Sequence, residues 1–497
     1  MAASEQVEVE LKFDVDPGHT APDLRALPGV VSATEPETFE LDATYFDTEN
    51  LDLAGNRITL RRRTGGTDAG WHLKRPSDTP GARRELTVGF DEAPADGDVP
   101  EPLLTPVLAH IRTRSLRPVA VISTTRTVTR LLGVDDEPLA ELAEDLVTAQ
   151  SLLPGGHSHQ WAEWEFELLS GGNGKLLKAA EKTLRAAGAR PASSASKLAR
   201  AIGSTPTVHE PRLSKRPTAL ELVVTDIALH RNSLIAYDPL VREDAEDAVH
   251  QMRVACRRLR SVLSGFPTVL DAERTEHINS ELKLLARILG EARDSEVQLE
   301  LDKSLLAGEN ASPELRAALA GAETRTHDRA IRQAHKAMAS DRYFALLDAV
   351  DNLIASPPPG PDADLPATDV VDKAIARSRR HIRKAQARLA TLTEGSDEWS
   401  EQLHTIRKRA KRLRYSIDAA APLNKRRYRE IGEIAKKIQS ALGDFNDIRI
   451  NRAHLRSIVD AGELGAEDMF IVGRLDARLE ADAQRAVAEY RKAAKKL

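Results

Sequence analysis

The sequence predicts a chain of two parts: a mostly β domain that closes into a barrel with a charged interior, and an all-α region of two similar helical bundles. Three observations support this division. Short stretches of alternating apolar and charged residues fill residues 5 to about 202. From about residue 218 the chain becomes rich in Ala, Leu, Arg and Glu, which favour helices. Two groups of motifs in this second part recur at a nearly constant distance, which indicates a duplication.

The first expected strand, residues 7–13, sets the pattern of the β domain. Its residues alternate without a fault, with Val7, Val9, Leu11 and Phe13 on one face and Glu8, Glu10 and Lys12 on the other. Five later stretches also place charges of chosen sign on one face. These rows are Arg57, Arg61 and Arg63; His72 and Lys74; Arg126 and Arg130; Glu141 and Asp145; and Glu163, Glu165 and Glu167.

One charged row is explained by a face in contact with water. Two acidic and three basic rows in one small domain instead favour a closed barrel with a charged interior. Because unpaired buried charge is very costly, such an interior needs a highly charged guest.

Composition limits the class of protein. The length of 497 residues suggests about three domains of ordinary size. The net charge of -5 divides into -7 for the first 217 residues and +2 for the rest, so net charge alone indicates no nucleic-acid partner. Cys256 is the single cysteine, which excludes a disulfide framework and a cysteine-based metal site. No signal peptide or membrane span is evident, and these features predict a soluble cytoplasmic protein.

Breaks in the pattern predict the domain boundaries. Residues 1–203 are assigned to the β domain, which carries helical patches near 102–113 and 175–187. A polar linker marked by Pro follows at 204–217. The helical region then occupies 218–497, and a Pro-rich break at 355–361 divides it into repeats of about 218–354 and 368–497.

Each repeat contains a helix with a stripe of cations headed by a histidine. The stripes fall at i, i+3, i+7 and i+10 and comprise His250, Arg253, Arg257 and Arg260, then, 154 residues later, His404, Arg407, Lys411 and Arg414. The opposite sides are predicted core faces, formed by Met252, Cys256, Leu259 and Leu263 and by Ile406, Ala410, Leu413 and Ile417. A second marker, residues 289–294, recurs at 442–447. Two similar bundles about a pseudo-twofold axis are therefore expected.

The twin stripes favour an anionic ligand. A charged helix face is usually solvated, but no acid interrupts these stripes, and repelling charges are repeated in both copies. Nucleic acid would favour interleaved aromatic residues or a groove-reading helix, so it is an unexpected partner for this aromatic-poor region. A bare phosphate polymer needs only a dense cationic track. A metal ligand role for His250 and His404 is less favoured than a polar or oxyanion-donor role.

Several blocks resemble known families. The stretch 7–13 resembles the ExExK signature of the CYTH domain, the triphosphate tunnel metalloenzyme family. Six further blocks are similar to those of this family and follow its order: 45–48, 60–66, 71–74, 84–85, 164–168 and 196–198. From about Thr218 to the C-terminus the chain resembles the CHAD domain, named for its conserved histidines and α-helices. Together the two parts resemble the bacterial CYTH–CHAD fusion.

The CYTH resemblance implies an eight-stranded antiparallel tunnel that binds a linear triphosphate with Mg²⁺ or Mn²⁺. By this resemblance, the metal is held by Glu8 and Glu10 with glutamates among Glu163, Glu165 and Glu167, and Asp145 supports a second ion. The phosphate contacts come from Lys12, Arg61, Arg63, Lys74, Arg126 and Lys197. Register is open for Arg57, Arg84, Glu85, Arg130 and Glu141, because residues of the same type are neighbours. The implied catalytic set is Glu8, Glu10, Lys12, Lys74 and Asp145.

The expected reaction is metal-dependent hydrolysis of inorganic triphosphate. The CHAD resemblance implies binding of inorganic polyphosphate and, with it, association with polyphosphate granules. The same residues could act on a nucleoside or thiamine triphosphate, and cyclisation of ATP is the least favoured reaction. A non-catalytic scaffold that binds polyphosphate is the other alternative. The acidic rows argue against it, since carboxylates repel phosphate unless a metal intervenes.

Overall fold

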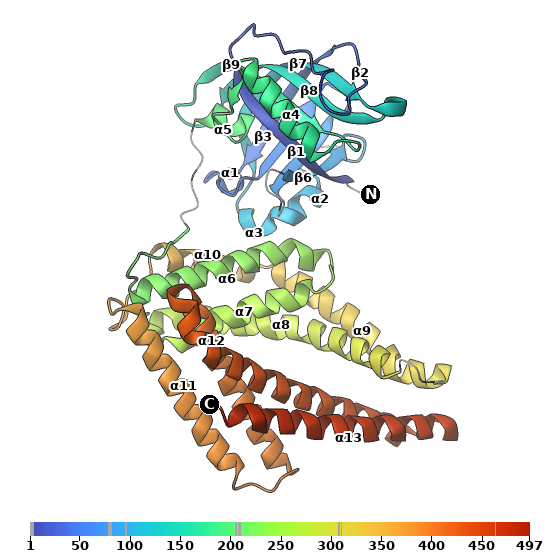
Figure 1. Cartoon of the computed structure of the whole chain (residues 1–497), viewed down its shortest axis with the longest axis vertical. Coiled ribbons are helices and arrows are strands. Elements are labelled where there is room, and N and C mark those ends of the chain that lie inside the picture. The colour runs from blue at the N-terminus through green and yellow to red at the C-terminus, as the bar shows by residue number, and fades with distance from the viewer. Residues whose placement is uncertain are drawn as a thin grey trace. The chain divides into compact units, whose positions relative to one another are not determined.

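The computed structural model describes residues 4–77, 82–94, 97–203, 206, 210–306, 309, 311–462 and 464–497. The chain divides into two compact units, Met1–His209 and Glu210–Leu497 (Figure 1). Of the predicted linker 204–217, residues 204, 205 and 207–209 lie outside the described part of the chain.

The first unit is an antiparallel barrel. Its eight strands are β1 (Ser4–Val15), β3 (Glu37–Asp47), β4 (Thr59–Thr64), β5 (Gly70–Pro76), β6 (Ala82–Gly89), β7 (Arg117–Leu132), β8 (Pro138–Ser151) and β9 (Ser158–Leu168). They follow one another in the order β1-β6-β5-β4-β3-β7-β8-β9, and β9 pairs back onto β1. The short strands β2 (Ser32–Ala33) and β10 (Arg190–Pro191) pair with β7 and β1. The predicted eight-stranded antiparallel fold is confirmed.

Much of the hydrophobic core of this unit lies outside the barrel wall. Trp164 and Phe166 of β9 pack with Leu176 and Leu184 of the helix α4 (Gly174–Ala186), which lies across the outer face (Figure 1). The remaining short helices are α1 (Asp52–Gly55), α2 (Glu101–Leu104), η1 (Thr105–Val107), α3 (Leu108–Ile111), η2 (Val134–Asp136) and α5 (Lys197–Ile202). Because successive strand residues alternate in direction, burying the apolar residues outside turns the charged ones toward the lumen.

The second unit is all α, as predicted. Its helices are α6 (Ala219–Arg242), α7 (Ala248–Gly265), α8 (Ala272–Leu305), α9 (Pro313–Met338), α10 (Asp341–Ala355), α11 (Ala367–Leu389), α12 (Asp397–Ala461) and α13 (Ala466–Ala494). The chain of α12 leaves helical geometry at Asn424, where φ is -164° and ψ is 88°. Its two halves therefore correspond to α7 and α8, and α11 and α13 correspond to α6 and α9. None of the described helices is long and apolar enough to cross a membrane.

The two repeats begin in reciprocal contact. The amide of Ala219 donates to the carbonyl of Leu365 at 2.8 Å, and the amide of Ala367 donates to the carbonyl of Pro217 at 3.0 Å. Such an exchange is what a pseudo-twofold axis between α6 and α11 produces. The predicted core faces of α7 and α12 are buried except at Leu263, which is partly exposed.

Candidate functional site

The lumen of the barrel is a charged cavity of about 180 Å³. Side chains from every strand of the barrel reach it, because alternate residues point inward. Its charged lining within the described residues comprises eight cations, Lys12, Arg61, Arg63, Lys74, Arg83, Arg126, Arg130 and Lys197, and seven carboxylates, Glu8, Glu10, Asp68, Glu85, Glu141, Glu165 and Glu167. The predicted charged interior is therefore present.

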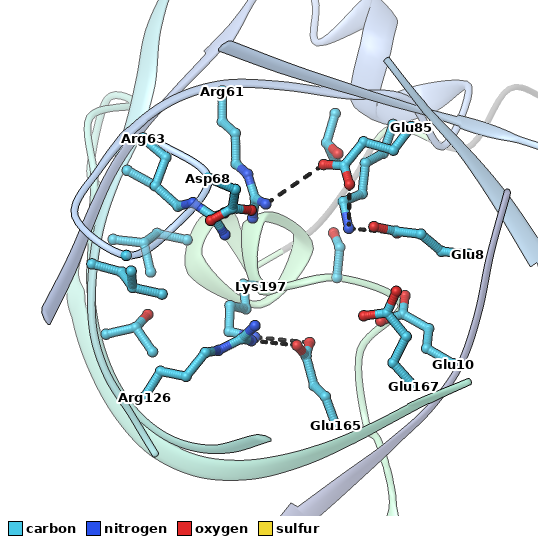
Figure 2. A pocket seen from close by; sticks show the side chains of 18 of the residues that line it. Glu8, Glu10, Arg61, Arg63, Asp68, Glu85, Arg126, Glu165, Glu167 and Lys197 are labelled. Atoms are coloured by element: carbon cyan, nitrogen blue, oxygen red, sulfur yellow. Dashed lines mark hydrogen bonds and ion pairs between the residues drawn. The ribbon is translucent and has the colours of Figure 1, made fainter. Parts of the chain in front are cut away.

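Carboxylates are concentrated on one side of this cavity and guanidiniums on another. Strands β1 and β9 are neighbours, with Glu10 opposite Glu167 and Lys12 opposite Glu165. They contribute an acidic wall, which we define as Glu8, Glu10, Glu165 and Glu167. Strands β4 and β7 contribute a basic wall, which we define as Arg61, Arg63 and Arg126. Figure 2 shows Arg63 and Arg126 across the cavity from Glu8, Glu10 and Glu167.

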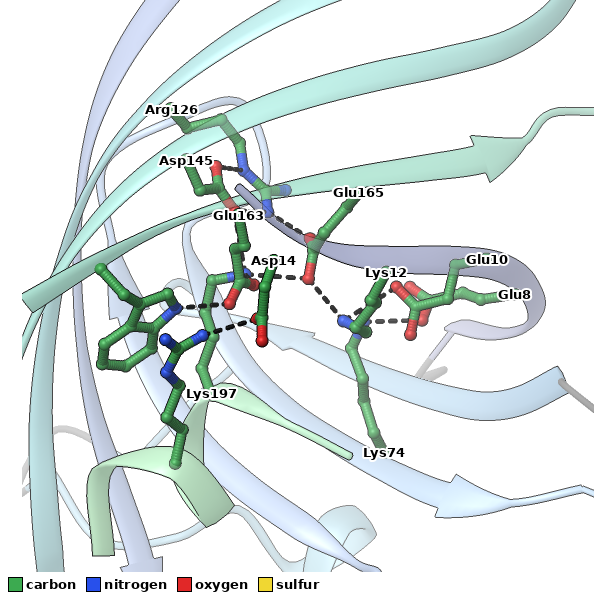
Figure 3. Close-up of polar contacts among 12 residues, drawn as sticks. Glu8, Glu10, Lys12, Asp14, Lys74, Arg126, Asp145, Glu163, Glu165 and Lys197 are labelled. Atoms are coloured by element: carbon green, nitrogen blue, oxygen red, sulfur yellow. Dashed lines mark hydrogen bonds and ion pairs between the residues drawn. The ribbon is translucent and has the colours of Figure 1, made fainter. Parts of the chain in front are cut away.

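A dense ion-pair cluster connects the two walls at one end. Arg126 grips the carboxylate of Asp145 with two hydrogen bonds of 2.8 and 2.6 Å and also contacts Glu165 (Figure 3). The ammonium of Lys197 lies 2.9 Å from Asp145, 2.6 Å from Glu163 and 2.8 Å from Glu165. Lys12 pairs with Glu165 and, at 3.0 Å, with Glu10.

These cations determine the ionisation of the buried acids. Burial opposes the charge on Asp145, but Lys197 and Arg126 outweigh it and hold the pKa of Asp145 below its usual value. Glu165 is buried too, and Lys12, Lys197 and Arg126 hold its pKa well below the usual value. Both carboxylates are therefore anions at neutral pH. Burial also opposes the charge on Lys197, yet its three acidic partners raise its pKa.

The other end of the acidic wall lacks this compensation. Burial raises the pKa of Glu8 to about 8, aided by a hydrogen bond with Glu85 and opposed by Lys74, whose ammonium lies 2.6 Å away. Burial likewise raises the pKa of Glu167 to about 6; Lys74 opposes the shift, while Glu10 and other acids add to it. This part of the lumen is short of positive charge, and a cation placed there would be stabilised.

The acidic residues fit a hard divalent cation. Asp145, Glu163 and Glu165 each offer a carboxylate oxygen, and these atoms lie within 4.8 Å of one another. Hard cations such as Mg²⁺ take carboxylate oxygens as ligands. Lys197 already lies against all three carboxylates, whereas the raised pKa values of Glu8 and Glu167 indicate that the charged forms of these two carboxyls are poorly compensated. The donor chemistry is therefore suitable in both places, and the second has the stronger need for a cation.

The basic wall, in contrast, would be stabilised by an anion. The Nε atoms of Arg61 and Arg63 are buried, and neither has a hydrogen-bond partner within the described part of the chain. Burial and the neighbouring guanidiniums of Arg61 and Arg126 lower the pKa of Arg63 to about 9. Arg61 reaches the Tyr45 hydroxyl at 3.5 Å and Glu85 at 3.7 Å, both long contacts. An anion bound here would satisfy donors and relieve repulsion.

Most candidate residues of the barrel meet in or next to the lumen, but Arg57 and Arg84 do not line it. Arg57 is exposed in the turn before β4, where its φ of 60° takes it out of the strand alternation. Arg84 is exposed on β6, and its neighbours Arg83 and Glu85 face inward. On these grounds we do not include Arg57 and Arg84 in the candidate site.

The lumen residues that sequence reasoning missed include Arg83, Tyr45 and Asp68. Alternation from Glu85 would have selected Arg83 over Arg84, because residues two apart share a face. Asp68 lies in the β4–β5 turn and pairs with Arg63. No strand periodicity applies to a turn, so no sequence signal pointed to Asp68.

In the helical unit the twin stripes converge. Lys411 of α12 is mostly buried, and burial lowers its pKa to about 7, helped by Arg407 of its own stripe and by Arg257 and Arg253 of the other. Both histidines belong to the same basic environment. Burial lowers the pKa of His250, with Arg293, Arg257 and Arg253 adding to the effect. The pKa of His404 is lowered in the same way, by burial and then by the neighbouring cations Lys408, Arg407 and Lys411.

Equivalent glycines support equivalent arginines of the two stripes. A Cβ at Gly290 would lie 3.5 Å from the guanidinium of Arg253, and a Cβ at Gly443 would lie 3.4 Å from that of Arg407. Both glycines occupy the same place in the repeated marker motif. Because glycine has no side chain, each guanidinium can pack directly against the following helical segment.

Several arginines of the stripes also contact other side chains. Arg257 donates through Nε to the hydroxyl of Tyr415 at 2.7 Å, which links the two repeats. Arg253 pairs with Asp294 at 2.8 Å. Arg260 reaches Asn279 at 3.4 Å, and Arg414 reaches Asp418 at 3.6 Å. Arg253, Arg257, Arg407 and Lys411 lie close to one another where the two repeats meet, and His250 and His404 lie beside them. We call these four cations the centre.

Comparison with known proteins gives both units a family. Residues 6–202 match the CYTH domain, and residues 225–456 match the CHAD domain. Two curated proteins of Mycobacterium tuberculosis, described as "Uncharacterized protein MT2285" (strain CDC 1551 / Oshkosh) and "Uncharacterized protein Rv2226" (strain H37Rv), are each 39% identical over 487 residues, or 94% of this chain and 92% of theirs. A solved CHAD domain from the plant Ricinus communis is 20% identical and covers 58% of this chain and 96% of its own, with a TM-score of 0.45. With the closed barrel, its charged lumen and the duplicated helices, the matches of residues 6–202 to CYTH and of residues 225–456 to CHAD show that the chain belongs to the CYTH–CHAD fusion proteins.

Proposed function

We propose that the barrel is a metal-dependent triphosphatase that hydrolyses inorganic triphosphate, and that the helical unit binds inorganic polyphosphate. The observation that carries the first half is the opposition of the two walls. A linear triphosphate is a polyanion, and it matches the unsatisfied donors of Arg61 and Arg63. The acidic wall repels phosphate unless a divalent cation lies between them, so both walls together fit a metal-bound triphosphate.

The side chains of the lumen have separate tasks in this reaction. Arg61, Arg63 and Arg126 hold phosphate oxygens and keep the chain in line, which is most of what phosphoryl transfer demands of a protein. Lys12 and Lys197 lie between the walls and stabilise charge that develops on the transferred group. A carboxylate of the acidic wall orients the attacking water. The bound cation supplies charge neutralisation and Lewis acidity.

The second half of the proposal depends on the convergence of the twin stripes. Four cations meet in one place, where burial and then the repulsion of the neighbouring arginines lower the pKa of Lys411. A polyphosphate chain carries a charge on every unit and would neutralise all four at once. The pseudo-twofold arrangement suits a ligand whose units are identical along its length.

A catalytic role for the barrel is favoured over a scaffold role by the acidic wall. Binding of polyphosphate alone needs cations, and Glu8, Glu10 and Glu167 would only weaken it. Charged side chains dominate the described lining of the lumen, and this favours inorganic triphosphate over nucleoside or thiamine triphosphates. A panel of these three compounds with Mg²⁺ or Mn²⁺, read by release of phosphate, pyrophosphate and cyclic nucleotide, tests that preference.

Two sets of variants test the division of labour. Glu8→Ala or Glu10→Ala should abolish metal-dependent phosphate release and leave polyphosphate retention intact. Changing Arg253, Arg257, Arg407 and Lys411 together to Glu should abolish retention and leave phosphate release intact. Circular dichroism and thermal unfolding control for misfolding. If folded variants of both sets lose both properties, the assignment of separate sites is wrong.

A further inference from the structure

Helix α11 carries a second concentration of positive charge that the twin stripes do not include. The 21 residues from Lys373 to Thr393 contain seven Lys and Arg and one His, and no Asp or Glu. Like charges one helical turn apart destabilise a helix by a few tenths of a kcal/mol per pair. The two acids of α11, Asp369 and Asp372, both precede this run. The run itself has no compensating acid and therefore retains an avoidable cost, for which a solvated surface alone gives no reason.

Four of these cations form one exposed row, which we call the α11 surface. Its members are Arg377, Arg380, Lys384 and Arg388, all exposed, and a spacing of three or four residues keeps them on one side of the helix. The row covers about 16 Å at 1.5 Å per residue. The apolar side of α11 is buried, with Val371 and Ile382 fully enclosed. The remaining arginines of the run, Arg379 and Arg383, bind the carbonyl of Leu497 and belong to the packing of the unit.

The fold does not require this row. In the first repeat α6 occupies the position of α11, and it contains only two cations, Arg231 and Arg242. Each is held by an acid: Arg231 pairs with Asp351 at 3.0 Å and Arg242 with Asp238 at 2.7 Å. The two repeats thus share the twin stripes but differ in this helix, and the α11 surface is a feature added to one of them.

The α11 surface is continuous with the twin stripes. On α12, a helix that turns about 100° per residue, Lys408 lies about 60° round from Lys411, and Arg412 lies a further 40° round. Both side chains are exposed. Next along the surface is Arg409, whose guanidinium donates to the carbonyl of His381 on α11. A band of positive charge therefore runs from the centre between the repeats, across α12, to α11.

A second contact fixes the other side of this band. Arg377 donates to the carbonyl of Gly265 at the end of α7 at 3.3 Å. The row on α11 thus begins where α7 ends and borders α12 near His381. Residues 367–389 contain no Phe, Trp or Tyr. Stacking on aromatic side chains is the usual means of holding unpaired bases, so the surface is suited to a polyanion without bases.

We propose that the α11 surface extends the polyphosphate site, so that a long chain runs from the centre between the repeats over Lys408 and Arg412 onto α11. This inference rests on the proposed polyphosphate binding and adds a path and a length dependence to it. A short chain fills the centre and gains nothing from α11. A long chain contacts both places and is held more tightly, as for two linked binding sites.

To test the path, we would replace three exposed cations together by Gln. These are Arg380, Lys384 and Arg388, whose side chains have no described partner. The matched control replaces Lys175, Lys178 and Lys182 by Gln, because these are exposed cations on α4 in the other unit and remove the same charge. Long-chain polyphosphate is titrated into the full chain at several salt concentrations, without divalent metal. Each lost phosphate contact lowers the slope of log Kd against log[salt] by about 0.7, so the α11 variant should lose about 2. Its Kd in low salt should rise about tenfold or more, and the control should match the unaltered protein.

The outcomes separate the path from the proposed function. An unchanged slope and Kd for the α11 variant, in a protein that binds polyphosphate, overturns the path and leaves the centre standing. If Arg407→Gln with Lys411→Gln keeps full affinity, the proposed centre is wrong, whatever α11 does. If the α11 variant loses affinity for single-stranded RNA but binds polyphosphate like the unaltered protein, the α11 surface is a nucleic-acid site and the inference is overturned. Polyphosphate of a few units should bind the α11 variant and the unaltered protein equally.

Discussion

At the scale of single residues, we expect Asp68 to compete with substrate for the basic wall. Its carboxylate pairs with Arg63 at the edge of the lumen, and its carbonyl accepts a hydrogen bond of 2.9 Å from Nε2 of His72. Gly65 shapes the turn, with a φ of 80° and a position where a Cβ would lie 2.0 Å from the carbonyl oxygen of Glu40. Asp68 is therefore held where a phosphate oxygen of the substrate would bind Arg63.

We expect Asp68→Asn to lower the KM for triphosphate by about 3- to 10-fold and to leave kcat nearly unchanged, since the substrate no longer displaces a charged partner of Arg63. Steady-state phosphate release measures both constants. Asp136→Asn, at an exposed residue of the β7–β8 turn, is the control and should behave like the unaltered protein. A KM that stays the same or rises would show that Asp68 does not compete for Arg63.

Lys411 should make polyphosphate binding depend on pH. Its pKa is lowered to about 7 by burial and by Arg407, Arg257 and Arg253, against which Asp447 acts weakly. A bound polyanion favours the charged ammonium and raises this pKa, so binding takes up a proton when the free side chain is neutral. Affinity should be highest below pH 7 and fall as pH rises above 7, by up to tenfold per unit.

The measurement is the Kd for polyphosphate at a series of pH values from 6 to 9 at constant ionic strength. Lys411→Arg keeps its charge over this range and should remove most of the dependence. If the Arg variant retains the full slope, another group is responsible, and the histidines of the stripes are the next to test.

At the scale of elements, strand alternation predicted most of the lumen but could not resolve every register. The stretch 7–13 has no two adjacent residues of like charge, so its inward face was read correctly. In the run Arg83-Arg84-Glu85 either arginine could face the lumen, and the pairing of β6 with β1 and β5 decides which one does. Arg57 does not line the lumen for another reason: it precedes β4 in a turn, where strand alternation does not apply. The helical stripes were visible at their spacing, but their convergence depends on how α7 and α12 pack, which no local pattern contains.

The short helix α5 is the element that brings Lys197 into the lumen. It has six residues, and the hydroxyl of Ser196 caps it by accepting from the amide of Ala199 at 3.1 Å. Loss of such a cap costs about 1 kcal/mol. We expect Ser196→Ala to raise the KM for triphosphate a few-fold, because Lys197 at the first helical position loses its fixed place.

A matched cap in the other unit is the control for this effect. Ser340 caps α10 by accepting from the amide of Tyr343 at 3.4 Å. Ser340→Ala should lower stability by a similar amount and leave the KM for triphosphate unchanged. Equal kinetic effects of the two substitutions would mean that general destabilisation, and not the position of Lys197, controls the reaction.

At the scale of the whole molecule, the two units handle charge in different ways. In the barrel, acids and bases lie within one closed lumen and neutralise each other in part, so the ligand must bring both signs, as a metal with a phosphate chain does. In the helical unit the central cations have few acids near them, and an anion alone suffices. Metal should therefore be needed for one ligand and not for the other.

Thermal unfolding can separate these two ligands in the full chain, because each should stabilise only its own unit. A ligand at about 100 times its Kd stabilises the folded state by about 2.7 kcal/mol, which corresponds to a rise in Tm of about 5–10 °C for units of this size. Polyphosphate with a metal chelator should raise the transition of the helical unit alone. Mg²⁺ with a non-hydrolysed triphosphate analogue should raise that of the barrel alone, and Glu10→Ala should cancel only this second shift. If either ligand raises both transitions by the same amount, the units do not bind or unfold independently, and the assignment of one ligand to each fails.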